Sequence, residues 1–361
     1  MSTSVLEVAT NNGKARRRGK VRVPTITLAH GGGGKAMHDL IDDIFLEAFD
    51  NEGQAPLEDQ ARLSLADMAA LGDRLAFTTD SYVVKPIEFP GGNIGKLAIC
   101  GTVNDLAVGG AKPLYLSCGV IIEEGLPVET MRMVARTMAA TALEAGVKVV
   151  TGDTKVVERG ACDKLFINTA GVGVIREGVN LGVDKARPGD VILVNGLLGD
   201  HGAAILNARG DMALTTAIES DCAALHGLID TLLSAVPNTR FLRDATRGGL
   251  ATVLNEIAEA SQVGIEIYED RTPIRSEVKG FCEILGLDPL YLANEGKIVC
   301  VVPPEDAETA LAALQSHPHG KGAAKIGDVT DHRPGRVVMQ TVFGGRRIVD
   351  MLVGEQLPRI C

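Results

Sequence analysis

Strand-like and helical segments alternate in the first half of the chain, and this alternation is the feature that most constrains the fold. Residues 114–122 form an apolar run that predicts a strand. Between residues 130 and 145 the apolar residues recur with the period of a helix, and Gly146 is suited to end it. Residues 147–150 and 165–175 predict two further strands. The chain is therefore predicted to have a mixed α/β (α+β) fold.

The remaining segments extend this pattern to the second half and indicate two domains. Further strands are expected at 75–79, 191–194, 298–302, 323–329 and 337–342, and helices at 37–49, 95–108, most of 207–235, from 250 onward and at 305–319. A Pro-Gly turn at residues 187–190 separates the halves. The expected parts are a mobile basic arm (1–24), an N-terminal domain (25–182), a C-terminal α/β domain (183–345) and a flexible tail (346–361).

Charge and cysteine content exclude several classes of protein. The net charge of −10 argues against a general nucleic-acid binder. Seven cysteines without a CxxC motif fit a reducing cytoplasm better than a disulfide framework or a zinc site. The chain shows no signal-peptide pattern and no apolar run of membrane-spanning length, so we expect a cytoplasmic protein with no membrane partner.

Three carboxylates in the first half indicate a magnesium site. Asp80 follows the strand at 75–79, Asp153 follows the strand at 147–150 with Lys155 beside it, and Asp105 lies in an otherwise apolar helix. Hard oxygen ligands of this kind suit Mg²⁺ that bridges phosphates. The alternatives are a simple turn acid at Asp80 and a hydrogen-bonded or capping acid at Asp105.

Two glycine-rich stretches are candidates for phosphate binding. Four glycines at residues 31–34 precede Lys35, and their backbone N–H groups could converge on an anion. Ala36 follows the lysine, so the stretch is not a Walker A motif, and a flexible linker is the alternative. Thr246 is a plausible N-cap before two glycines and a helix, which makes either an anion site or an ordinary cap.

Two further residues have an ambiguous pattern. Glu295, between Asn294 and Gly296, is either a general base or an exposed turn acid, and composition alone favours the turn acid. Cys361 is the last residue of the sequence, after a stretch with one flexible joint at Gly354. The sequence either happens to stop on cysteine or carries a swinging arm that delivers a thiol-bound group.

Several stretches together resemble the HypE family of [NiFe] hydrogenase maturation proteins. The stretches are AHGGGGKAM (29–37), CGTVNDLAV (100–108), GDTK (152–155), RDATRGGLA (243–251), NEG (294–296) and PRIC (358–361). The resemblance extends over residues 25–361. Ala245 stands where the family pattern leads us to expect proline, a loop change that leaves the acid and the glycines in place.

The resemblance implies a fold and an activity. The family is similar to aminoimidazole ribonucleotide synthetase and selenophosphate synthetase, which implies a two-domain ATP-binding fold, an N-terminal sheet that forms a barrel in a homodimer, and ATP near the subunit interface. It also implies that the terminal thiol receives a carbamoyl group from HypF and that ATP-dependent dehydration converts this group to a thiocyanate. The cyano group then passes to the HypC–HypD complex and to the hydrogenase iron.

The resemblance also implies roles for the candidate residues. Cys361 carries the group, Glu295 is the base, and Lys155 is a second catalytic candidate. The cofactors are ATP and Mg²⁺, with Asp80, Asp105 and Asp153 as the metal ligands. The residues expected to bind ATP are Gly31, Gly32, Gly33, Gly34, Lys35, Asn104, Asp153, Asp244 and Thr246.

Two other functions remain open. One is another small-molecule synthetase of the same superfamily, but selenophosphate synthetase needs a reactive residue near the N-terminus, and residues 1–99 contain no cysteine. The ribonucleotide synthetase has no use for a terminal thiol. The other is a non-catalytic carrier whose tail only holds the group for partners.

Overall fold

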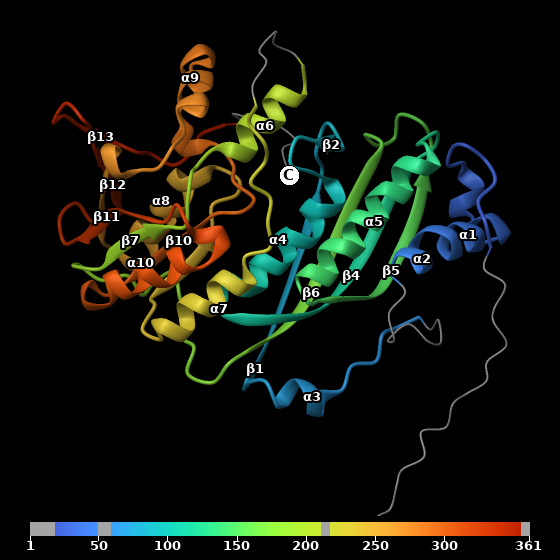
Figure 1. Cartoon of the computed structure of the whole chain (residues 1–361), viewed down its shortest axis with the longest axis horizontal. Coiled ribbons are helices and arrows are strands. Elements are labelled where there is room, and N and C mark those ends of the chain that lie inside the picture. Colours follow the sequence, from blue (N-terminus) through green and yellow to red (C-terminus); the bar gives the residue numbers. More distant parts are fainter. Residues whose placement is uncertain (1–18, 50–58, 211–216, 355–361) are drawn as a thin grey trace, which may run out of the picture.

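The structure is a computed structural model that describes residues 19–49, 59–210 and 217–354. It contains a four-stranded sheet of order β1-β6-β4-β5, a seven-stranded sheet of order β13-β12-β9-β11-β7-β10-β8 and a small β2-β3 ribbon (Figure 1). Helices pack on both larger sheets. The mixed α/β fold predicted from the sequence is confirmed.

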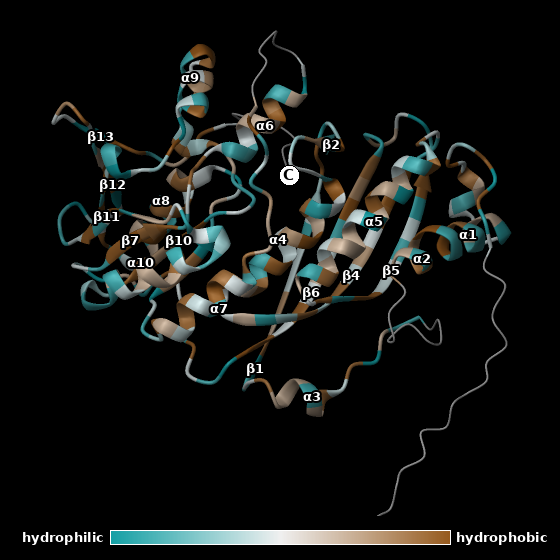
Figure 2. Cartoon of the chain, in the orientation of Figure 1, coloured by the Kyte–Doolittle hydropathy of each residue, from teal (hydrophilic) through white to brown (hydrophobic). Residues whose placement is uncertain are grey.

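In the part of the chain that the structure describes, helices cover one face of the N-terminal sheet and leave the other uncovered. Its strands are β1 (Arg74–Tyr82), β4 (Ala111–Glu123), β5 (Lys148–Val157) and β6 (Leu165–Ile175), and the helices are α4 (Ile94–Val108) and α5 (Val128–Glu144). β4 and β5 are parallel, and the other pairs are antiparallel. Asn93 starts α4 by accepting the backbone N–H groups of Gly95 and Lys96. The expected apolar period of α5 buries Met131, Val134 and Met138 in the core that α5 shares with this sheet. Figure 2 shows hydrophobic and hydrophilic residues recurring along α5.

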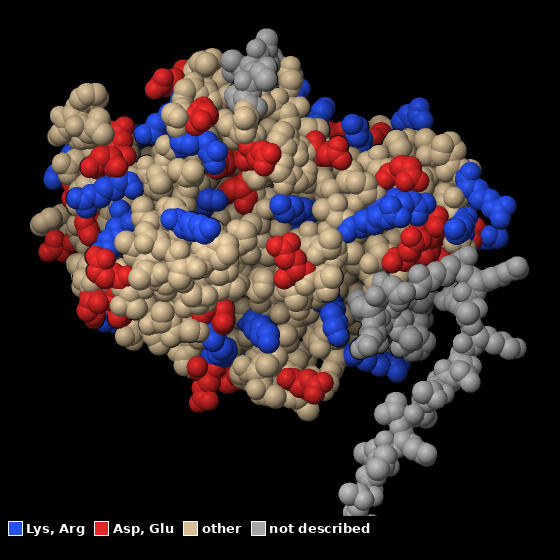
Figure 3. All heavy atoms as spheres, in the orientation of Figure 1, with Lys and Arg blue, Asp and Glu red and all other residues tan. Residues whose placement is uncertain are grey.

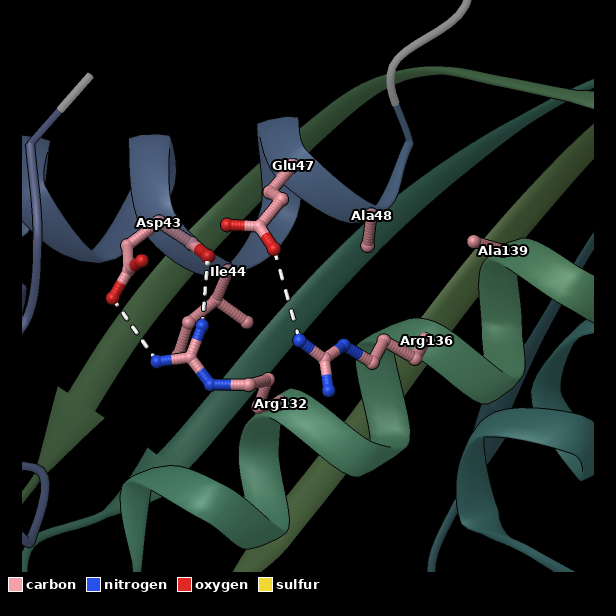
Figure 4. A pocket seen from close by; sticks show the side chains of 7 residues that line it. All are labelled: Asp43, Ile44, Glu47, Ala48, Arg132, Arg136 and Ala139. Carbon is pink, nitrogen blue, oxygen red and sulfur yellow. Dashed lines mark hydrogen bonds and ion pairs between the residues drawn. The ribbon is translucent and has the colours of Figure 1, made fainter. Parts of the chain in front are cut away.

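The first helical segment packs on the outside of α5. It consists of α1 (Lys35–Leu40), a π-helical turn (Ile41–Phe45) and α2 (Leu46–Ala48). Figure 4 shows Arg132 and Arg136 of α5 pointing toward Asp43 and Glu47. These residues line a hollow of about 200 Å³. Because Arg132 and Asp43 are both largely buried, this ion pair fixes the segment more firmly than the exposed Arg136 pair does.

The described end of the predicted arm contacts the same segment. The backbone N–H of Gly19 donates to Asp42, and that of Val21 donates to Asp43. Residues 19–24 are therefore attached to the domain, contrary to the expectation for the arm, because two buried carboxylates accept their backbone donors. Residues 1–18 lie outside the described part of the chain.

The C-terminal sheet has helices on both faces. Its strands are β7 (Val191–Val194), β8 (Phe241–Asp244), β9 (Gly264–Tyr268), β10 (Ile298–Val302), β11 (Ala324–Thr330), β12 (Arg336–Gln340) and β13 (Arg346–Ile348). The helices are α6 (Asp200–Ala208), α7 (His226–Ala235), α8 (Gly249–Ser261), α9 (Ser276–Leu285) and α10 (Ala307–Ser316). α8 packs on one face, and α7 and α10 pack on the other, so every residue of β10 is buried.

Shorter elements complete the described chain. They are α3 (Leu65–Ala69), β2 (Glu88–Phe89), β3 (Gly92–Asn93) and 3₁₀ turns at Leu28–Gly31, Glu269–Arg271, Pro289–Tyr291, Pro304–Asp306 and Pro318–Gly320. None of the helices in the described ranges has the length and apolar character needed to cross a membrane. On the face shown in Figure 3, acidic and basic side chains are interspersed.

Two sequence-based boundaries differ from the structure. The helix expected over most of 207–235 is wrong, because α6 ends at Ala208, residues 217–225 are not helical and α7 begins at His226. The expected tail begins inside β13, which pairs with β12, so the sheet extends through Ile348. Residues 355–361, and Cys361 with them, lie outside the described residues.

Residues 217–225 are held by contacts with both domains. Asn104 of α4 donates from Nδ2 to the carbonyl oxygen of Ala223 at 3.0 Å and of Glu295 at 3.5 Å, and its Oδ1 accepts the N–H of Leu225 at 2.7 Å. The N–H of Ser220 donates to the carbonyl oxygen of Pro90. These contacts give backbone groups of the segment the hydrogen-bond partners that a helix would otherwise provide.

We predict that Asn104→Ala destabilises the protein by about 2–4 kcal/mol, because it leaves buried backbone groups without partners. Urea unfolding measures the loss. Asn238→Ala is the control, since that exposed side chain makes one long hydrogen bond to Asp306, and it is expected to cost less than about 0.5 kcal/mol. Equal stability of Asn104→Ala and the unmodified protein would contradict the role of Asn104.

Candidate active site

Four carboxyl groups converge where the two domains meet. Asp80 lies on β1 and Asp105 on α4, whereas Asp244 ends β8 and Glu295 lies in the turn before β10. Asp244 is opposite Ile298 in the β8–β10 ladder, which brings this turn beside the end of β8. Electrostatic interactions connect Asp244 with each of the others. We call these four residues the acid cluster.

The alternation of β1 directs Asp80 toward α4. Asp80 is opposite Thr169 in the ladder with β6, and paired residues point to the same face. Thr169 is fully buried, and its Oγ1 donates to the carbonyl oxygen of Ala98 in α4. Thr78, two residues before Asp80, donates from Oγ1 to Oδ2 of Asp105 at 3.2 Å. Asp80 and Asp105 therefore lie on the same side of the sheet.

Burial and mutual repulsion raise the pKa values of the acid cluster. Burial raises the pKa of Asp105 to about 7, with smaller contributions from Asp244 and Asp80. Burial raises the pKa of Asp244 to about 6. Glu295 is only 3% exposed, its Oε1 has no hydrogen-bond partner among the described residues, and burial raises its pKa well above the ordinary value. The exposed turn acid that composition favoured is therefore wrong for Glu295.

Arg247 brings positive charge to the acid cluster. Its Nη2 lies 3.4 Å from Oδ1 of Asp80, and its charge lowers the pKa of Asp105 and of Asp244. The expected N-cap at Thr246 is wrong, because Gly248, with a left-handed φ of 76°, caps α8. A side chain at Gly249 would put its Cβ 2.5 Å from the carbonyl oxygen of Leu292. The two glycines therefore permit the turn that presents Arg247.

The predicted magnesium ligands are not assembled within one chain. Asp153 pairs with Gly119, whereas the next residue, Thr154, is buried on the helix-covered face. Asp153 thus points to the opposite face of the sheet from Asp80. The expected set of Asp80, Asp105 and Asp153 is wrong for a single chain, because β5 continues to Val157 and its side chains alternate.

The acid cluster still fits a magnesium ion that is shared with a nucleotide. No group of three or more His, Cys, Asp and Glu side chains among the described residues could hold a metal ion alone. Mg²⁺ usually binds one or two carboxylates and completes its shell with water and substrate phosphates. Asp80 and Asp105 lie on one side of the sheet, and the pKa of Asp105 is raised mainly by burial and further by the like charges of Asp244 and Asp80, which a bound cation would offset.

The glycine loop, residues 31–35, lies at the other edge of the sheet. Gly31 packs on β5, where an added Cβ would come within 2.8 Å of the backbone nitrogen of Val156. Lys35 is 86% exposed and pairs with Asp39. Lys155 is next to Val156 and forms an ion pair of 3.1 Å with Asp153. Because β1 and β5 are three strand spacings apart, this group lies roughly 14 Å from Asp80 across the sheet.

The remaining predicted ATP ligand, Asn104, uses its side chain within the chain. Both ends of its amide bond to the backbone of residues 217–225 or to the carbonyl oxygen of Glu295. The geometry thus gives Asn104 a structural role and does not support a direct nucleotide contact.

A cleft of about 440 Å³ opens beside the Glu295 turn. Its polar lining includes Asn195, Asp200, Asp221, Arg275, Lys297 and Lys321. The Asp221 and Lys297 side chains form a buried ion pair of 2.9 Å. Sequence reasoning missed Asp221 because it falls in the segment expected to be helical. Gly210, whose φ is 71°, is the sequence signal that a helix ends before this segment.

Comparisons with known proteins give one consistent result. Residues 58–175 match the N-terminal domain model of AIR synthase related proteins, and residues 187–340 match the C-terminal domain model. Carbamoyl dehydratase HypE of Rhodobacter capsulatus is 60% identical over 341 residues, which cover 94% of this chain and 99% of that protein.

Solved structures agree with these relatives. A HypE crystal structure in complex with ATP is 51% identical, covers 93% of this chain and 100% of its own, and superposes with a TM-score of 0.88. HypE in a HypE–HypF complex is 48% identical, covers 88% of this chain and 100% of its own, and gives a TM-score of 0.75.

The raised pKa of Asp105 predicts a pH-dependent stability. The folded state binds the Asp105 proton more tightly than the unfolded state does, so the contribution of this residue is fully present below its ordinary pKa of 3.8 and is lost as the pH rises through about 7. The Asp105→Asn side chain cannot ionise, so this variant does not lose stability at residue 105 as the pH rises. In EDTA and without nucleotide, it is expected to be more stable than the unmodified protein at pH 7.5 by up to about 4 kcal/mol.

Urea unfolding at pH 4 and pH 7.5 tests this expectation. The difference between the two proteins should shrink toward pH 4. Asp153→Asn is the control, since that exposed carboxylate lies on the opposite face of the sheet. A difference that is the same at both pH values would contradict the assignment of the effect to Asp105.

Proposed function

The chain belongs to the HypE family of carbamoyl dehydratases, and we propose that it uses ATP to dehydrate an S-carbamoyl group on its own Cys361 to a thiocyanate. One observation of the structure carries this proposal. Glu295 is a buried carboxyl group with an unpartnered Oε1, and it lies in the acid cluster between the two domains. A reaction that needs both a base and phosphate-bound magnesium requires such a place.

The chemistry determines what these residues do. The carbamoyl oxygen is a poor leaving group, and transfer of the γ-phosphate of ATP to it makes a good one. Loss of the two amide protons then expels phosphate and forms the C≡N bond, so S-carbamoyl and ATP yield S-cyano, ADP and phosphate. Glu295 accepts a proton in this step. Because its pKa is raised, it is a stronger base than an ordinary carboxylate once it is ionised.

The two edges of the sheet hold different parts of ATP. The glycine loop and Lys155 bind phosphate oxygens through backbone N–H groups and positive charge. Asp80 and Asp105 hold Mg²⁺, which, when bound, supplies positive charge to the reacting phosphate. Asp244 contributes its charge to the acid cluster, and Thr246 contributes the backbone of the turn before α8. Lys155 is a second candidate for handling a proton near the thiol.

A homodimer would bring the glycine loop and Lys155 of one subunit close to the acid cluster of the other. The uncovered face of the N-terminal sheet exposes Leu75 (58%), Phe77 (73%) and Ile121 (41%). Asp153 and Lys155 lie on this same face, since Ile121 is opposite Lys155 in the ladder. We infer that two such faces meet in a barrel and that the site is completed at the subunit interface, which buries these apolar side chains.

Disruption of this face tests the dimer. Phe77→Glu is expected to convert the dimer to a monomer, because it would bury a charge in the barrel, and to lower ATP-dependent activity at least tenfold. Light scattering after gel filtration measures the mass. Leu143→Glu, at an 82% exposed position on α5, is the control and should remain dimeric. A dimeric Phe77→Glu variant would argue against the sheet-to-sheet interface.

The tail passes its group between partners. We propose HypF as the carbamoyl donor, since one similar structure is a HypE–HypF complex. The HypC–HypD complex is the proposed acceptor of the cyano group. The six described cysteines are all free thiols, which fits our placement of the reaction in the reducing cytoplasm.

The intact mass of the C-terminal peptide tests the reaction. After incubation with HypF, carbamoyl phosphate and ATP, Cys361 should gain a carbamoyl group that loses one water when further Mg-ATP is added. Cys361→Ala should gain nothing. A carbamoyl group that forms but never loses water would favour the non-catalytic carrier, and no adduct at all would favour a small-molecule synthetase.

A further inference from the structure

Asp221 is a buried charge next to the candidate base, and neither the reaction nor any nucleotide contact accounts for it. Its side chain is 4% exposed, and its Oδ2 lies 2.9 Å from Nζ of Lys297, which is 13% exposed. Burying an ion pair costs solvation free energy, so it is retained only where the geometry compensates for that cost. The contacts of the Asp221 carboxylate show what it does.

Asp221 holds the backbone of the Glu295 turn at two consecutive positions. Its Oδ1 accepts the N–H of Glu295 at 3.0 Å, and its Oδ2 accepts the N–H of Gly296 at 3.2 Å. From the other side, the carbonyl oxygen of Glu295 accepts the N–H of Ala223 at 3.3 Å. The peptide groups on both sides of the Glu295 Cα are therefore fixed by the same short segment.

The turn has no space in which to relax. A Cβ at Gly296 would lie 2.0 Å from the carbonyl oxygen of Asp221. Asn104 ties the same segment to α4 through Ala223, Leu225 and the carbonyl oxygen of Glu295. The position of the Glu295 Cα relative to Asp105, one residue after Asn104, is thus set through residues 221–225.

We propose that Asp221 is the positioning residue of Glu295: its carboxylate, balanced by Lys297, aims the Glu295 side chain into the acid cluster. This inference rests on the proposed function. Asp221 acts through the backbone of Glu295 and is not itself a catalytic residue. Burial alone would raise the pKa of Asp221, but Lys297 and the backbone N–H of Glu295 lower it below its ordinary value.

The groups around Glu295 all disfavour its ionised form. Burial is the main cause of its raised pKa, followed by Cys222, Asp244, Asp221 and Asp80, and the buried Tyr82 also interacts with it. Loss of the Asp221 charge would therefore lower the pKa of Glu295.

The pH dependence of dehydration separates positioning from simple stability. The measurement uses protein whose Cys361 has been carbamoylated by HypF. The rate of dehydration should rise with pH as Glu295 ionises. Asp221→Asn should lower kcat roughly 10- to 100-fold and move this rise to lower pH. Asp221→Glu keeps the charge but displaces it, so kcat should fall while the rise stays at the pH of the unmodified protein.

Asp190→Asn is the matched control. Asp190 is also buried, accepts the N–H of Arg187 and pairs with Arg240 at 3.5 Å, but it lies at the start of β7 away from the acid cluster. This variant should lose stability without any shift in the pH profile. Thermal unfolding identifies variants that do not fold. If Asp221→Asn is among them, Asp221→Glu decides alone: a lowered kcat supports positioning, and an unchanged kcat overturns it.

Outcomes that overturn the inference differ from those that overturn the function. An unmodified chain that never dehydrates its carbamoyl group overturns the proposed function and this inference with it. An active unmodified chain beside Asp221 variants with unchanged kcat and pH profile overturns the inference alone. The same conclusion follows if Asp221→Asn lowers kcat no more than Asp190→Asn does and leaves the pH profile in place.

Discussion

Loss of solvent around carboxylates at the domain junction is the constraint on which the rest of the structure depends. Asp105, Asp244 and Glu295 are drawn from α4, the end of β8 and the turn before β10, and burial is the main cause of each raised pKa. A folded chain keeps such groups only where something is gained from them. Under the proposed function, a divalent cation bound here would offset the negative charge of these carboxylates and of the phosphates.

Polar contacts between distant segments add to apolar packing in holding the acid cluster in position. Asn104 connects α4 to residues 217–225, and Asp221 connects the same segment to the Glu295 turn. The segment has no regular secondary structure, so its peptide groups are free to accept these partners. A helix at this place would have used the same groups internally and could not have linked the two domains.

The sequence and the structure agree best where a single element decides the outcome. The period of α5 and the apolar run of β10 predict their burial, because each pattern reports one face of one element. Predictions of which side chains from different elements come together were less accurate. Asp80 and Asp105 were expected together and lie on one side of the sheet, but Asp153 was expected with them and points to the opposite face. Its side was hidden because the predicted strand stopped at residue 150, before the alternation reached Asp153.

The sequence by itself determined the α/β architecture, the family and the residue types available for chemistry. These follow from local periodicity and from short motifs, which need no knowledge of distant contacts. Only the tertiary structure decided that Glu295 is buried rather than exposed and that Gly248 rather than Thr246 caps α8. It also decided that the Asp221 carboxylate accepts a hydrogen bond from the backbone of the Glu295 turn. Burial and ion pairing depend on residues far apart in the chain, here more than 70 positions for Asp221 and Glu295. No local pattern records which of them will meet.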